Sequence, residues 1–119
     1  MTPDETQSQI NSHFDRAEEN VKEVYAALLR MLRELGPVAV EPKKTCLHLV
    51  NRTALAGVYP KRQVLQLEFK SDYPITDPLV VKTEQISRNR WHHIVRLSSP
   101  SDLQNPIASW IRDSYALSG

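Results

Sequence analysis

One cysteine and three of the four histidines could bind a metal ion or act as nucleophile and base. Cys46 and His48 alternate along one predicted strand and share a face, whereas His92 and His93 are adjacent on another strand and face opposite ways. If these strands were neighbours, Cys46, His48 and one of His92 or His93 could supply three zinc ligands. No C-x-x-C pair and no suitably spaced acid supports such a site, so we predict no metal and a small buried cysteine.

The same pair could also be imagined as a cysteine nucleophile and its base. Residues two apart on a strand place their Cβ atoms about 6.5–7 Å apart, which is beyond hydrogen-bond reach. The three glycines of the chain do not form a phosphate-binding loop, and no serine elbow is present. The sequence therefore favours a binding module without a cofactor over an enzyme. A ligand pocket lined by Cys46, His48, His92 and His93 is kept as the alternative.

Basic side chains gather in the middle of the chain. Residues 36–96 carry 10 basic and 5 acidic side chains, whereas residues 1–35 carry 4 and 7 and residues 97–119 carry 1 and 2. Most of these bases fall in predicted turns near Trp91, His92 and Tyr59, as in sheets that hold a phosphate backbone and stack bases. Exposed bases that keep sheet edges apart are the competing interpretation. The candidate anion-binding residues are Lys43, Lys44, Arg52, Lys61, Arg62, Arg88 and Arg90.

The elements that must position these residues follow from apolar periodicity and turn signals. Ser12 is the expected cap of a helix over residues 13–35, which ends at Gly36 and Pro37. Asn105 and Pro106 are expected to start the last helix. Between them the alternation predicts strands over residues 38–40, 45–51, 55–59, 64–69, 79–85 and 91–97. Short turns between the strands predict an antiparallel meander.

The predicted fold is a two-layer α+β domain, in which a long N-terminal helix and a C-terminal helix pack on five or six antiparallel strands. Residues 1–11 are expected to be a flexible lead-in and residues 12–119 a single domain, as the length of 119 residues allows. A single cysteine and an acidic, polar N-terminus predict a cytoplasmic protein. No apolar run is long enough to cross a membrane.

Three stretches of the chain carry a family resemblance. Residues 44–52, KTCLHLVNR, and 61–74, KRQVLQLEFKSDYP, together with residues 111–115 near the C-terminus, resemble a bacterial family, the domain of unknown function fifty-six fifty-five. The resemblance covers roughly residues 22–117. It implies the same fold and names no activity. Many longer members have a glycine-rich turn where this chain has residues 87–91, so a role tied to that turn is not expected here.

The leading hypothesis is therefore a binding module that holds an anionic partner such as nucleic acid on a basic sheet edge. The second is the pocket of cysteine and histidines described above. The third is a homodimeric interaction domain, whose helical face would include Trp110 and Tyr115.

Overall fold

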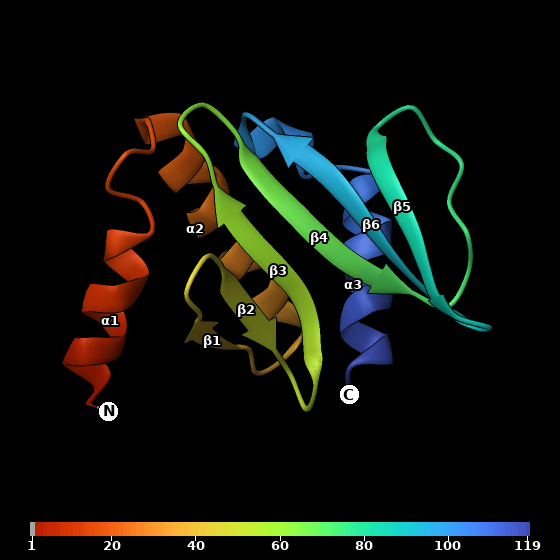
Figure 1. Ribbon diagram of the computed structural model, residues 1–119, viewed down its shortest axis with the longest axis horizontal. Coiled ribbons are helices and arrows are strands. Elements are labelled where there is room, and N and C mark those ends of the chain that lie inside the picture. Colours follow the sequence, from red (N-terminus) through yellow and green to blue (C-terminus); the bar gives the residue numbers. More distant parts are fainter. Residues whose placement is uncertain (1) are drawn as a thin grey trace.

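The computed structural model describes residues 2–119, which form three α-helices and one six-stranded sheet (Figure 1). The helices are α1 (Pro3–Ser12), α2 (Glu19–Leu35) and α3 (Ile107–Leu117), with a short 3-10 helix η1 (Pro100–Asp102) before α3. The strands are β1 (Ala39–Pro42), β2 (Leu47–Val50), β3 (Ala54–Pro60), β4 (Leu65–Ser71), β5 (Val80–Ser87) and β6 (Arg90–Leu97). The predicted strands agree with these bounds to within two residues at each end.

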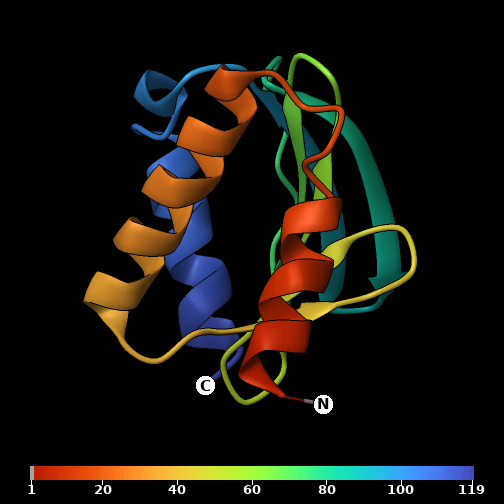
Figure 2. The same ribbon diagram turned by 90° about the vertical axis from the view of Figure 1, so that its left-hand side faces the viewer.

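The sheet is covered by helices on one face only. In Figure 2, α2 and α3 lie together on one side of the sheet, and no helix of residues 2–119 lies on its other side. Alternation along β4 places Leu65, Leu67 and Phe69 in the core and Gln66 and Glu68 outside, as predicted. We call the uncovered side the open face of the sheet. The predicted two-layer α+β class is confirmed.

The apolar stripe of α2 is the largest helical contribution to the core. Val21, Val24, Leu28 and Leu32 are completely buried, at the spacing of one helix face. Beneath them lie the inward side chains of β2, β3, β4 and β6, which include Leu49, Val58, Leu67 and Val95. The N-terminal helix predicted from the sequence therefore packs as expected over most of its length.

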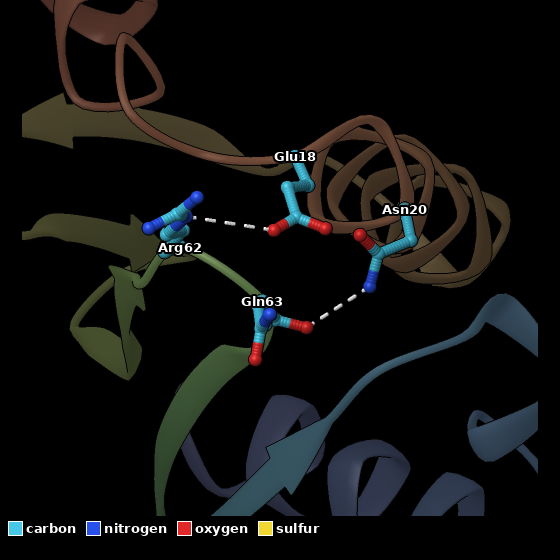
Figure 3. Close-up of polar contacts among 4 residues, drawn as sticks. All are labelled: Glu18, Asn20, Arg62 and Gln63. Atoms are coloured by element: carbon cyan, nitrogen blue, oxygen red, sulfur yellow. Dashed lines mark hydrogen bonds and ion pairs between the residues drawn. The ribbon is translucent and has the colours of Figure 1, made fainter.

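The start of this helix differs from the prediction. The predicted helix over residues 13–35 is non-helical in its first six residues. Helix α1 ends at Ser12, and α2 begins at Glu19. The junction is fixed by the turn between β3 and β4 (Figure 3). The backbone N–H of Glu18 donates to the carbonyl of Arg62 at 2.8 Å, and Asn20 Nδ2 donates to the carbonyl of Gln63 at 3.0 Å. These tertiary contacts determine where α2 begins. The predicted cap at Ser12 does not start this helix.

Residues Pro3–Ser12 form helix α1, in the segment where the sequence led us to expect a flexible lead-in. Thr2 Oγ1 accepts a hydrogen bond from the backbone N–H of Glu5 at 3.2 Å, Pro3 occupies the first turn, and Ile10 reaches the core. A threonine cap, a first-turn proline and early acids are a recognisable start signal in the sequence. The polar composition of the segment argued against a packed helix. In the structure, Ile10 is the one buried residue of α1.

The strand order is β1-β2-β3-β4-β6-β5, with every pair antiparallel. The predicted meander is therefore correct for the first four strands and for the β5–β6 hairpin, and it is wrong about the neighbour of β4, which is β6 and not β5. Side-chain composition explains the order. β6 supplies His93, Val95 and Leu97 to the core, whereas every residue of β5 after Val80 is exposed. An edge position suits a strand with so little to bury.

We predict that Leu28→Ala lowers the free energy of unfolding by about 2–5 kcal/mol, because it leaves a cavity beneath α2. Leu35→Ala on the same helix is the matched control. Its side chain is 41% exposed, so the expected loss is about 0.5 kcal/mol or less. Urea unfolding followed by circular dichroism measures both. Equal losses for the two variants would contradict the described packing of α2.

Candidate functional site

The open face of the sheet is hollowed above Gly57. This residue pairs with His48 on β2 and Glu68 on β4 and has no side chain to fill the space between them. The hollow has a volume of about 110 Å³, and its lining residues are His48, Ala54, Leu55, Ala56, Gly57, Tyr59, Glu68, Phe69, Lys70 and His92. A cavity of this size holds a few waters, a small ion or one edge of a ring, and it is smaller than ordinary cofactor sites.

Aromatic and ionisable groups surround the hollow. The ring of Tyr59 lies against the Gly57 backbone, since a Cβ added at Gly57 would approach the Tyr59 ring to 3.3 Å. His92 Nδ1 lies 3.3 Å from Glu68 Oε1, and both side chains are about one-third exposed, at 38% and 34%. Burial raises the pKa of Tyr59, and the nearby Cys46 thiol raises it further. Tyr59 therefore remains a neutral phenol that can stack or donate a hydrogen bond.

Two neighbouring cations have no carboxylate partner among the described residues, Lys70 at one margin of the hollow and Arg90 near Lys70. Lys70 Nζ donates to Thr53 Oγ1 at 2.9 Å. Burial lowers the pKa of Lys70, and the positive charge of Arg90 lowers it further. Arg90 Nη1 is buried and has no hydrogen-bond partner among the described residues. A buried guanidinium nitrogen without an acceptor is costly, and an anion placed between Lys70 and Arg90 would relieve both effects.

The antiparallel topology separates the predicted anion-binding residues into two groups at opposite ends of the sheet. Lys43 and Lys44 lie in the β1–β2 turn, and Lys61 and Arg62 lie in the β3–β4 turn, at what we call the Lys43 end. Arg52 lies in the β2–β3 turn, and Arg88 and Arg90 lie at the β5–β6 turn. This second end, which also holds Lys70, is called the Lys70 end. The seven residues therefore do not form one basic edge.

Carboxylates offset part of the charge at the Lys43 end. Lys43 Nζ lies 3.5 Å from Glu41 Oε1. Arg62 Nε lies 3.6 Å from Glu18 Oε2, where it helps to hold the start of α2 (Figure 3). The ammonium of Lys61 lies 5.9 Å from the centre of the Tyr59 ring. Arg62 is thus already engaged in the fold.

At the Lys70 end the cations have no such partners. Within residues 2–119, none of Arg52, Lys70, Arg88 and Arg90 forms an ion pair. Thr53, which accepts from Lys70, follows Arg52 directly and links the β2–β3 turn to the end of β4. The Lys70 end is therefore the stronger candidate for an anion site.

The cysteine and histidines are not brought together as one pocket. β3 and β4 lie between β2 and β6, so His48 and His92 are on strands about 14 Å apart, from three inter-strand steps of about 4.8 Å. Both still line the hollow from opposite sides, whereas Cys46 and His93 do not. Among residues 2–119, no group of three or more histidine, cysteine or acidic side chains is placed to hold a metal ion.

His93 is a structural residue on the helix-covered face. Its Nε2 lies 2.7 Å from Ser71 Oγ, and its Nδ1 lies 3.0 Å from Thr83 Oγ1. The hydroxyl of Ser71 donates to the carbonyl of Tyr73, so Ser71 Oγ must accept from Nε2–H and Nδ1 must accept from Thr83. The fully satisfied ring is neutral. Burial lowers its pKa, which outweighs the opposite effect of the Tyr73 backbone.

The candidate residues predicted from the sequence did not include Lys70, Glu68 or Gly57. Alternation along β4 carried the signal, since Gln66, Glu68 and Lys70 must share the polar face of that strand. Gly57 opens the hollow, and a β-bulge lies nearby, between Leu49 and Val50 on β2 opposite Ala54 and Ala56.

The fold and the open face define a two-layer α+β protein with one uncovered sheet surface. Residues 10–118 match the family described as Domain of unknown function (DUF5655), and the chain belongs to that family. No curated protein and no solved structure gives a significant match. In the part of the chain that the structure describes, no helix has both the length and the apolar composition that crossing a bilayer requires.

We predict that His93 makes stability depend on pH in the acid range. Its folded pKa lies below the unfolded value of about 6.5, so the unfolded chain takes up the proton first. The contribution of His93 is therefore complete above pH about 6.5 and is lost as the pH falls through the folded pKa. Urea midpoints measured between pH 8 and 5 should show a decline that His93→Gln reduces. His48→Gln, on the open face, should retain the decline, and an unchanged slope in His93→Gln would contradict the assignment.

Proposed function

We propose that the protein binds an anionic partner, single-stranded nucleic acid, on the open face at the Lys70 end of the sheet. The observation that carries the proposal is the pair formed by Lys70 and Arg90. These cations are close enough for Arg90 to lower the pKa of Lys70, and no described carboxylate pairs with either. A phosphate would neutralise both charges and accept from the guanidinium of Arg90.

Phosphate contacts would come from two neighbouring side chains. Lys70 Nζ supplies charge and is positioned by the Thr53 hydroxyl, which accepts from it at 2.9 Å and donates to the carbonyl of Ser118, and the guanidinium of Arg90 supplies further donors. Arg52 and Arg88 lie in the adjoining turns and would extend the contact to neighbouring phosphates.

The hollow beside these cations supports contact with a base. Tyr59 and His92 present rings at its margin, and Gly57 leaves room for the edge of one further ring. Uncovered antiparallel sheets that bind single strands combine such rings with flanking bases, because stacking tolerates any base. The bacterial origin and the cytoplasmic setting inferred from the sequence form part of the same proposal, and the unpaired buried Cys46 is compatible with a reducing compartment.

Fluorescence anisotropy with a labelled single-stranded DNA and its RNA counterpart, over a range of salt concentrations, tests the site. We expect Lys70→Gln/Arg90→Gln to weaken binding at least tenfold. The slope of log Kd against log salt should fall by about 1.4, for two lost contacts to a single strand. Lys43→Gln/Lys44→Gln removes the same charge from the opposite end and should have a smaller effect.

Equal losses for the two double variants would show that binding follows net charge and would contradict a site at the Lys70 end. Absence of binding to either strand at low salt would reject the proposal. Duplex DNA of the same sequence is the control for base contact, since its bases are not free to stack on the open face.

A separate variant tests the hollow. Gly57→Ala adds one methyl group that meets the Tyr59 ring at 3.3 Å, so the ring must shift slightly and the hollow becomes shallower. We expect a loss of affinity for single strands of roughly threefold to tenfold, with a salt slope unchanged from that of the parent protein. Unchanged affinity would show that the partner contacts only the cations.

A further inference from the structure

Strand β5 is the less protected edge of the sheet. It has β6 as its single strand neighbour, and the segment that connects β4 to β5 runs past its outer side without forming a strand there (Figure 1). The opposite edge is formed by β1, which has only four residues, ends in Pro42 and has α1 beside it. β5 has eight residues and no proline.

Exposed apolar side chains concentrate at the same edge. Leu79, Val81 and Ile86 are 47%, 49% and 49% exposed, and Leu35 is the one other large apolar residue in residues 2–119 with comparable exposure. The helical face expected to form a dimer is engaged within the fold instead. Trp110 stacks on Phe69 at 6.0 Å, and the Tyr115 hydroxyl donates to the carbonyl of Pro37 at 3.1 Å.

We propose that β5 pairs with β5 of a second copy, antiparallel about a two-fold axis at Thr83. Directly opposed residues of an antiparallel pair point to the same face of the sheet. In a two-fold symmetric pair of β5 strands, the residue at the axis must therefore lie opposite the same residue of the second copy. Each possible register is defined by that central residue, and a short strand allows only a few of them.

Charge selects among these registers. Centres at Lys82 or Glu84 would place like charges directly opposite each other, which is destabilising. A centre at Gln85 leaves Lys82 and Glu84 without opposite charges. A centre at Thr83 places Lys82 opposite Glu84 of the second copy, twice by symmetry. This register alone places both charges opposite charges of the other sign.

Two irregularities limit how far such pairing extends. The β5–β6 register shifts between Val80 and Lys82 and again between Gln85 and Ser87, so the regular segment runs from Lys82 to Gln85. Bulges at both ends of a short edge segment shorten the stretch with which a partner strand can pair. The paired segment thus coincides with the residues whose charges are complementary. The two open faces would lie on the same side of one continuous sheet.

Charge-swap variants of the full chain test the register directly by sedimentation equilibrium. Lys82→Glu and Glu84→Lys should each weaken dimerisation about tenfold or more, because each replaces two attractive pairs with two repulsive ones. The double variant Lys82→Glu/Glu84→Lys should restore the parental affinity. An equimolar mixture of the two single variants should form a mixed dimer, since every facing pair is then of opposite sign.

Circular dichroism spectra and urea midpoints serve as the control that all variants are folded, and both positions are exposed. The proposal would be overturned if the parent protein stays monomeric at concentrations up to about 1 mM. Any dimer would then have a Kd above that range, which corresponds to very weak association. A dimer that both single variants retain would also overturn it, because the interface would then lie elsewhere. A dimer lost in both single variants and in their mixture would overturn the register at Thr83.

Discussion

Burial of one face of the sheet beneath α2 and α3 is the constraint on which the rest of the structure depends. Because side chains alternate along each strand, covering one face assigns every strand residue to the core or to the open side. His92 and His93 show the consequence most directly. His93 is enclosed as a neutral ring between Ser71 and Thr83, while His92 stands on the open face beside Glu68. The two neighbours therefore have unrelated roles.

The same topology sorts the positive charge. Consecutive hairpin turns lie at opposite ends of a sheet, so bases that are close in sequence are divided between the two ends. At the Lys43 end, Glu18 and Glu41 offset Arg62 and Lys43, and the Glu18 pair also anchors α2. At the Lys70 end no cation forms an ion pair within residues 2–119. This difference, which net charge does not show, makes one end of the sheet a better site for an anion than the other.

Edge protection is similarly unequal. The sheet shields β1 by its short length, by Pro42 and by the neighbouring α1, whereas β5 has only bulges and alternating charge. The insertion of β6 between β4 and β5 creates this situation, because it moves the more apolar strand inward and leaves the polar one outside. The open face and the β5 edge are thus separate surfaces, one suited to an anionic chain and one to a second copy.

Local pattern in the sequence was sufficient for the elements. The stripe of Val24, Leu28 and Leu32 specified a helix face, and the alternation of Leu65, Leu67 and Phe69 specified a half-buried strand, because each depends only on nearby residues. Strand order, the break between α1 and α2, and the meeting of Lys70 with Arg90 were decided by tertiary structure. Each depends on contacts between residues far apart in the chain, such as Glu18 with Arg62, and no local period encodes which strands become neighbours.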